Sequence, residues 1–547
     1  MTLFRFGLLA LVVAVVFSTA VGCGGDDDDD SSGDDVSSDD DDSADDDDSS
    51  DDDTVDDDTT DDDSVDDDTS DDDTATDDDT ADDDIEYADD YIAPWPQQNI
   101  PPRVYDESPS AGPLRVKAEE YDQWNLDWHQ PYYGGIVETD FVSTDYDEVA
   151  NYYYWNDSTE WTGVYLTSQA MRYYVTGEAQ AKANVLKAAS MLSGNLHVTG
   201  RPGFLARYHA PKDPLIYQGD EWCDSNEGEQ DRCHRVESGE YAGDWWWGET
   251  SRDMYNGWFL GLGMAFDLVD DEDMREQIRM DMAEVLDELI STDWVIIDEA
   301  GEPTTKAPQV QPPFRISWLL IGYHVTGHAR FADQLRPLLL NDYRKTFGFA
   351  MINFFNRYVE YFGHCLSHEF FYNWLRLSKV YFSPDDAAFF AELFETRAHE
   401  PVRLTHNAFF NAVYMSQGAY DPEAESPDPY LGQLIEDLTD FRPAPNYQYY
   451  LPDRDPDSYT LDPVSVLLGD LSDQYPGLFD LIFGHFHYQA LEAFPIPEQC
   501  STDFLFQRNP FQIYACGADR PTHVFAGVDY LIGYWMAAYH GFVTKDM

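Results

Sequence analysis

Residues 245–271 read WWWGETSRDMYNGWFLGLGMAFDLVDD. In this stretch, 258–266 (WFLGLGMAF) is apolar at nearly every position, which predicts a helix that is buried on all sides. After a turn at 267–272, residues 274–282 (MREQIRMDM) place their apolar side chains on one face, which predicts an amphipathic helix. The stretch therefore predicts a helical hairpin with one inner and one outer helix.

The same hairpin pattern recurs along the chain. YVTGEA at 174–179 is echoed by HVTGHA at 324–329, and similar turns stand at 383–386 and 420–423. Runs of Val and Ile that would form parallel strands between the helices are missing from the sequence. Repeated inner–outer hairpins stack into a closed ring. We therefore predict an all-α toroid over residues 147–547, preceded by a leading segment over 86–146 that is irregular or forms a small β element.

The hairpin series, the stretch 245–271 and the closing stretch 528–542 (VDYLIGYWMAAYHGF) resemble the (α/α)6 toroids of six-hairpin glycosidase type, in particular exported bacterial members. The resemblance covers roughly residue 146 to the C-terminus. It implies a carbohydrate-active scaffold with acidic residues at the mouth of the toroid. Some relatives on this fold are lyases or epimerases, so the resemblance does not choose the reaction.

The N-terminus has the order of a secretory signal. Arg5 is the one charged residue of 1–22, an apolar run comes next at 8–17, and small residues precede Cys23. This order resembles a bacterial lipoprotein signal, in which the cysteine is lipidated. We expect a lipid anchor on Cys23 in the bacterial cell envelope, with Gly24 indicating the outer membrane. Display of the domain on the cell surface is a separate expectation. An ordinary secretory signal is the alternative.

Residues 23–85 are almost entirely Asp, Ser and Thr, and the pattern repeats about every five residues. Such a segment cannot bury enough apolar surface to offset its loss of entropy, so we predict a disordered, extended tether. The chain as a whole carries a formal charge of −77. Because this charge repels nucleic acid and no basic cluster opposes it, a nucleic-acid partner is excluded.

Four of the five remaining cysteines form two pairs that bracket short stretches. In an exported protein this predicts two disulfides, Cys223–Cys233 and Cys500–Cys516. Cys365 lies in an apolar segment and is expected to be a buried thiol. Calcium in the acidic loop 223–233 is a minor alternative to a plain solvated loop. We expect no other metal, no cofactor and a monomeric protein.

Two acidic pairs come after aromatic runs and stand where a helix is expected to begin. They are Asp157 with Glu160, and Glu249 with Asp253. Glycoside hydrolysis needs two carboxyl groups, so we predict one catalytic acid from each pair, with Glu249 the leading candidate. The competing interpretation is structural, because Asp157-x-x-Glu160 and Thr250-x-x-Asp253 both have the form of an N-terminal capping pair.

Aromatic rings beside carboxylates suit saccharides, whose C–H faces stack on rings. The candidate substrate-binding residues are Trp155, Trp245, Trp246, Trp247, Arg252, His406 and Arg508. The alternative to sugar binding is a core role for the three tryptophans at 245–247 and a structural role for His406. His364 and His368 stand four apart beside Glu369, but a further metal ligand is not evident.

These features predict a surface-tethered saccharide hydrolase. One alternative is a non-catalytic glycan-binding or envelope-adhesion protein. Another is a polysaccharide lyase, which would depend on Tyr and His rather than on a carboxylate pair.

Overall fold

The computed structural model describes residues 111–153, 157–217, 233–304, 307–339, 361–419, 429–474, 488–501 and 509–547. The predicted signal segment with Cys23 and the predicted tether lie outside these ranges. Trp155, Cys223 and Arg508 also lie outside them.

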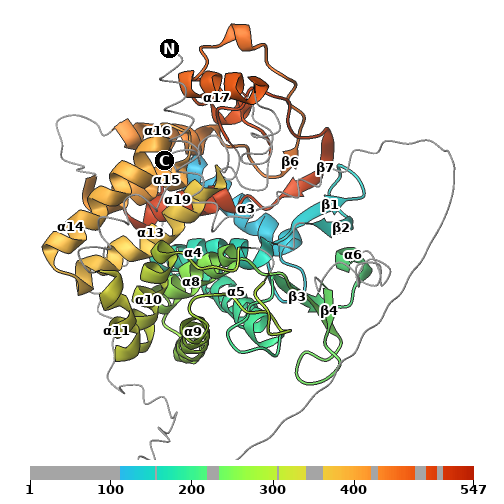
Figure 1. Cartoon of the computed structure of the whole chain (residues 1–547). Helices are drawn as coiled ribbons and strands as arrows, with labels where there is room; N and C mark the ends of the chain where they lie inside the picture. The colour runs from blue at the N-terminus through green and yellow to red at the C-terminus, as the bar shows by residue number, and fades with distance from the viewer. Residues whose placement is uncertain are drawn as a thin grey trace, which may run out of the picture. The chain divides into compact units, whose positions relative to one another are not determined.

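Helices of the described ranges form an inner ring and an outer layer (Figure 1). The inner helices are α4 (Ser158–Thr176), α8 (Arg252–Leu268), α10 (Pro312–Thr326), α13 (Phe362–Tyr381), α15 (Ala408–Tyr414) and α19 (Val528–Tyr539). Packing runs through them in this order and returns from α19 to α4, so the ring closes. The outer helices are α5 (Ala179–His197), α9 (Glu272–Ser291), α11 (Ala329–Leu338), α14 (Pro384–Leu393), α16 (Pro429–Asp440) and α3 (Pro113–Trp124). The predicted all-α toroid of hairpins is confirmed.

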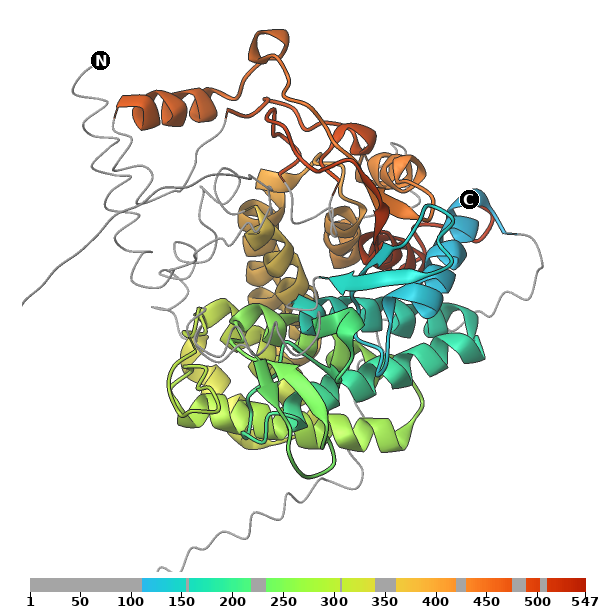
Figure 2. The ribbon, with the colours of Figure 1, turned by 90° about the vertical axis from the view of Figure 1, so that its right-hand side faces the viewer.

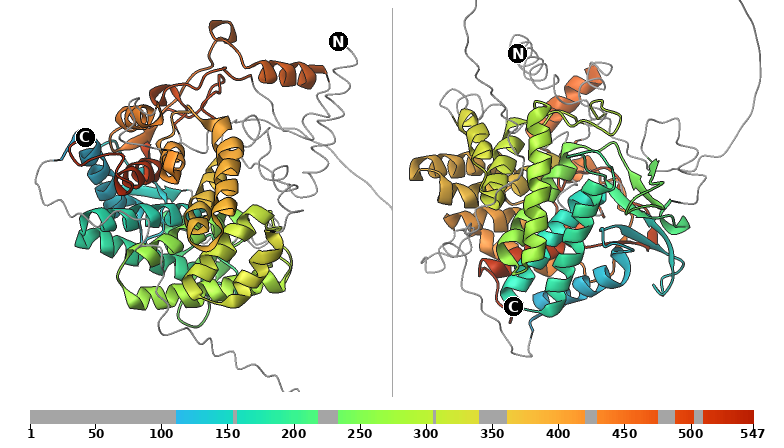
Figure 3. Two further views of the ribbon diagram at one scale, coloured as in Figure 1. Left: turned by 90° about the vertical axis from the view of Figure 1, so that its left-hand side faces the viewer. Right: turned by 90° about the horizontal axis from the view of Figure 1, so that it is seen from below.

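The two kinds of helix differ in burial as the sequence predicts. In α8 every residue from Met254 to Leu268 is buried. In α9 the buried residues, such as Met274, Ile278 and Met282, recur every four positions along one face. Outer helices α5 and α9 run side by side on the outside of the ring (Figure 3).

The turns between inner and outer helices form where the sequence predicts them. Gly177 ends α4 at φ 68° and Gly327 ends α10 at φ 74°, a left-handed conformation that glycine adopts without strain. The side chains of Asp271 and Ser383 accept the hydrogen bonds that begin α9 and α14. Residues 420–428, which include the fifth expected turn, lie outside the described ranges.

The expected irregular character of 86–146 is wrong where α3 forms, whereas strand β1 (Glu138–Phe141) agrees with the alternative of a small β element. Helix α3 is an outer helix, and it packs against α19 from the other end of the chain. The main chain joins the two ends, because Gly112 N donates to Lys545 O and Leu114 N donates to Met547 O. The sixth hairpin is therefore built from both ends of the toroid, which begins near residue 112.

Helices α4 and α8 touch through glycines. A Cβ atom on Gly257 would lie 2.4 Å from the carbonyl oxygen of Glu160, and one on Gly261 would lie 2.6 Å from that of Gly163. Because nothing larger than a hydrogen fits, these glycines let the first turns of the two helices lie against each other.

Two antiparallel sheets contain the strands that lead into α4 and α8 (Figure 2). One has the order β2 (Val149–Tyr153), β1 (Glu138–Phe141), β7 (Arg520–Phe525) and β6 (Asn446–Gln448), and the other β3 (Tyr208–Pro211), β5 (Asp244–Trp247) and β4 (Cys233–Arg235). Strand β2 precedes α4 and strand β5 precedes α8, so the sheets fix where these helices begin.

The remaining described elements are short. They are α6 (Pro214–Tyr217), α17 (Pro463–Gln474), the π-helical turns Asn125–His129, Phe394–His399 and Met415–Ala419, and the 3₁₀ turns Glu400–Val402, Pro456–Ser458 and Ile496–Glu498. Within the described ranges, every helix falls short of the length and apolar composition that a bilayer crossing requires.

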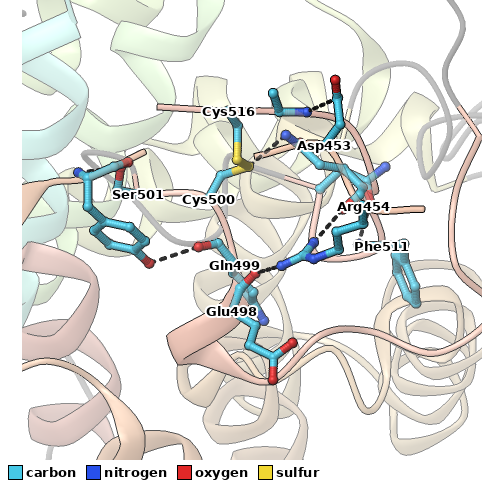
Figure 4. The surroundings of a disulfide bond; sticks show 12 residues. Asp453, Arg454, Glu498, Gln499, Cys500, Ser501, Phe511 and Cys516 are labelled. Carbon is cyan, nitrogen blue, oxygen red and sulfur yellow. Dashed lines mark hydrogen bonds between the residues drawn. A yellow bond between two sulfur atoms is a disulfide. The ribbon is translucent and has the colours of Figure 1, made fainter. Parts of the chain in front are cut away.

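The disulfide Cys500–Cys516 is present, as predicted, and Cys365 is a free, buried thiol. Around the disulfide, the Arg454 guanidinium donates to the carbonyl oxygens of Gln512 and Glu498, and Asp453 accepts from Ala515 N (Figure 4). Cys233 is also disulfide-bonded. Because Cys223 lies outside the described ranges, its pairing with Cys233 stays a prediction.

Candidate active site

Acidic side chains gather where α4, α8 and α13 meet. Asp157 directly precedes α4, Glu160 lies in the first turn of α4, and Asp253 lies in the first turn of α8. Glu369 comes from the middle of α13 and is fully buried. The charges of Glu369, Asp253 and Asp157 all raise the pKa of Glu160, so the structure brings the predicted acids of neighbouring hairpins together.

Glu160 and Glu369 share a hydrogen bond, so at least one of them carries a proton. Burial raises the pKa of both: well above the usual range for Glu160, and to about 8 for Glu369. Glu369 also accepts from Cys365 Sγ at 3.0 Å and from Asn256 Nδ2 at 2.7 Å. Donors therefore reach both oxygens of Glu369, and the raised pKa values mean that both acids hold a proton below about pH 8.

Asp253 reaches solvent, as does Asp157, whose side chain is 31 % exposed. The side chain of Asp253 is 28 % exposed, whereas Glu160 is 4 % exposed. Burial raises the pKa of Asp253, while the Arg252 and Arg207 charges lower it. Its Oδ1 atom accepts no hydrogen bond from the described residues, and Arg252 Nε stands 3.8 Å away.

Arg252 is unsatisfied as well. Its Nε and Nη1 groups are buried and donate no hydrogen bond within the described ranges. Its guanidinium lies over the ring of Phe314, with 5.6 Å from Cζ to the ring centroid. Buried polar groups are normally hydrogen-bonded, so adjacent unsatisfied donors and an unsatisfied acceptor mark a place for a polar ligand.

Arg207, the residue before β3, links the segments that begin α4 and α8. Its Nη1 donates to Asp157 Oδ1 at 2.7 Å, and its Nε donates to the Glu249 carbonyl oxygen at 2.9 Å. Its own carbonyl accepts from the Thr159 N–H and hydroxyl groups. The side chain is 11 % exposed. Arg207 therefore fixes the loop before α8 against the start of α4.

Glu249 lies in the loop between β5 and α8, as predicted, three residues before the helix begins. Its φ of 54° places a residue with a side chain in the left-handed region, which costs on the order of 1 kcal/mol. Strained backbone of this kind concentrates at functional sites, which supports Glu249 as a candidate.

The capping interpretation of the acidic pairs is wrong. Asp157 makes no side-chain capping bond to α4, because Arg207 holds its carboxylate instead. Thr250 does not cap α8, because Ser251 holds the cap position and the Thr250 hydroxyl donates to the Leu205 carbonyl oxygen.

Trp245, Trp246 and Trp247 form strand β5 and are only 4–6 % exposed. Trp246 stacks on His234 with 3.9 Å between ring centroids. Trp245 packs among Tyr208 and other core residues. This burial favours the core interpretation of the run over a sugar-stacking surface.

His406 stands one residue before the Asn407 cap of α15 and has a φ of 57°. Its Nδ1 lies 3.0 Å from Asp437 Oδ1 on α16. The hydrogen bond that His406 donates to Asp437 raises the pKa of His406, because it stabilises the charged ring. This contact supports the structural role. Trp155 and Arg508 lie outside the described ranges, so their predicted binding roles stay predictions.

The sequence pattern did not indicate the roles of two site residues, Arg207 and Glu369. Each is a charged residue in an apolar run, FLARY at 204–208 and HEFFY at 368–372. A charge in such a run signals a buried, paired group. In the described part of the chain, no group of three or more His, Cys, Asp or Glu side chains is arranged to hold a metal ion.

Comparisons with known proteins add one remote likeness. No protein-family model matches the chain, and no curated protein matches it. The GH76A alpha-1,6-mannanase from Salegentibacter sp. HEL1_6 is similar in structure, with 13 % sequence identity, a TM-score of 0.25, and coverage of 54 % of this chain and 88 % of that one. At this distance the likeness assigns no residue of the site, so the roles of the acids depend on their geometry alone.

Proposed function

We propose that this protein hydrolyses a glycosidic bond at the acidic cluster where α4, α8 and α13 meet. One observation carries the proposal: Arg252 and Asp253 present unsatisfied donors and an unsatisfied acceptor side by side. A saccharide hydroxyl both donates and accepts, so a single sugar ring can satisfy both residues.

The acids divide into the two roles that hydrolysis needs. Glu160 keeps its proton at neutral pH and is the proton donor to the leaving oxygen. Asp253, beside Arg252, is the carboxylate that activates water or attacks the sugar. Glu249 is the other candidate for the carboxylate. Glu369 is a positioning residue, because it touches Glu160 from the buried side.

The test is a screen of the full chain against a broad panel of glycans, with release of reducing ends as the readout. For a cleaved glycan, Asp253→Asn should reduce turnover by at least about a hundredfold. Glu249→Gln separates the two carboxylate candidates, because the larger loss identifies the catalytic group. Glu276→Gln, an exposed acid on α9, is the matched control.

The alternatives give different results in the same screen. A glycan that binds without cleavage would favour the binding or adhesion protein, and an unsaturated product would favour the lyase. Full turnover in both Asp253→Asn and Glu249→Gln would refute the assignment.

We also propose that the domain is displayed on the cell envelope by a lipid on Cys23 and an acidic tether. The support is the order of the N-terminal sequence. Labelling of cells with a fatty-acid analogue should mark the wild-type protein and leave Cys23→Ala unlabelled. Equal labelling of the two would contradict the anchor.

A further inference from the structure

A cavity of about 620 Å³ lies between the outer helices α5 and α9, away from the acidic cluster. Leu262 of α8 and the loop residues Glu240 and Tyr241 complete its walls. None of the proposed catalytic acids lines it. A volume of this size is in the range of small-molecule binding sites.

Asp281 of α9 is the buried charge of this cavity. The side chain is 1 % exposed. Its Oδ1 atom is satisfied by His197 Nε2 at 2.9 Å and by Gln277 Nε2 at 2.7 Å. Its Oδ2 atom is buried and accepts no hydrogen bond from the described residues. A buried carboxylate oxygen without a hydrogen-bond donor lowers the stability of the fold, so a ligand that donates to this atom would restore that free energy.

The walls carry an excess of negative charge. Among the described lining residues Asp271, Asp273, Asp281 and Glu240 are acidic, and none is Lys or Arg. Lys182 stands 3.5 Å from Asp271 at the edge of the cavity and balances that one carboxylate. The hydrogen bond to Asp281 raises the pKa of His197, so a protonated His197 offsets at most this one carboxylate. Asp273 and Glu240 then remain without a cation among the described lining residues. The cavity therefore attracts a positive charge and repels an anion.

The rest of the wall is apolar. Leu186, Met274 and Ile278 line it from α5 and α9. Met274 and Ile278 are 8 % and 2 % exposed, so they belong to the core and form a fixed surface. A bare metal ion would leave this surface unused, whereas an organic body would cover it.

We propose that this cavity binds a small organic cation, in which a primary ammonium group pairs with Asp281 and an apolar body covers Leu186, Met274 and Ile278. The site is independent of the proposed hydrolysis. The ammonium donates to Oδ2 of Asp281, and its remaining hydrogens face the acidic rim. This pairing supplies the hydrogen bond that the fold leaves unmade.

Benzylammonium chloride is the probe, and benzyl alcohol is its neutral match. Ligand-observed NMR titration of the full chain at constant ionic strength should show benzylammonium binding with a Kd of about 1 mM. Benzyl alcohol should bind at least about tenfold more weakly, because it lacks the charge. Equal affinity for the two, or no binding of benzylammonium, would overturn the proposal.

Two variants locate the site. Asp281→Asn keeps the shape and should weaken benzylammonium binding by about tenfold or more. Ser190→Trp, at an exposed position of the rim, should block the cavity without disturbing the core. Asp287→Asn, an exposed acid of the same helix paired with Arg330, is the control and should bind as the wild type does.

Two further outcomes would count against an organic cation. Unchanged affinity in both Asp281→Asn and Ser190→Trp would place the binding elsewhere. Displacement of benzylammonium by calcium chloride beyond that by sodium chloride of equal ionic strength would mean that the cavity takes a metal ion instead.

Discussion

Replacement of Glu369 by glutamine should change how the stability of the protein depends on pH. Burial raises the pKa of Glu369 from its ordinary value of 4.5 to about 8. Between these two values the folded protein holds a proton that the unfolded chain releases, so the free energy of unfolding falls as pH rises. One proton changes this free energy by about 1.4 kcal/mol per pH unit. From pH 5 to pH 8 Glu369 therefore removes about 4 kcal/mol of stability.

Glu369→Gln removes this proton-binding group and leaves the other titrating groups in place. At pH 5 the variant should be less stable than the wild type, because the glutamine amide opposes the donor on Asn256 or Cys365. The difference between variant and wild type should then shift by about 4 kcal/mol in favour of the variant by pH 8.

Urea denaturation of both proteins at pH 5, 6, 7 and 8 measures this difference. Glu276→Gln, at an exposed position of α9, is the control and should run parallel to the wild type. The reasoning would be refuted if the Glu369→Gln and wild-type values also stayed parallel within about 1 kcal/mol, because Glu369 would then titrate alike in the folded and unfolded states.

Three further predictions concern stability. Gly257→Ala should destabilise the fold by at least about 2 kcal/mol, since its Cβ would lie 2.4 Å from the main chain of α4. Gly432→Ala is the control and should not destabilise the fold, because the space around Gly432 is open. Equal melting temperatures of the two variants would contradict the contact between α4 and α8. Arg207→Met should destabilise the fold by about 2 kcal/mol in urea denaturation, because it removes the hydrogen bonds to Asp157 and to the Glu249 carbonyl oxygen. A change below about 0.5 kcal/mol would contradict its bridging role. Cys500→Ser with Cys516→Ser should lower stability by about 3 kcal/mol, and unchanged unfolding under reducing conditions would count against the disulfide.

Local signals explain why so much of the fold could be predicted. The hairpin turns depend on residues that act within one turn of helix, such as Gly177 and Ser383. The apolar character of α8 comes from its own residues. The closing hairpin could not be found in this way, because α3 and α19 lie about 400 residues apart and α3 sits in a segment rich in Pro and Tyr.

The acidic cluster was predictable in part for the same reason. Asp157, Glu160 and Asp253 stand near expected helix starts, so the hairpin pattern puts them at a common level in the ring. Their arrangement depends on contacts between distant segments. Arg207 takes the carboxylate that the pattern assigned to a cap, and Glu369 reaches Glu160 from a helix some 200 residues away.

The tryptophan run shows the limit of composition as a guide. Three adjacent rings next to acids suggest a sugar platform, but in a strand their side chains alternate between two faces. Both faces of β5 are covered here, so all three rings are buried.

The most direct test of the central claim is the rate at which Glu160→Gln releases reducing ends from a glycan that the wild type cleaves. Because Glu160 holds the proton that the leaving oxygen needs, the rate should fall by at least about a hundredfold while the glycan still binds. A variant that folds, binds the glycan and cleaves it at the wild-type rate would contradict the assignment of the acidic cluster as the catalytic centre.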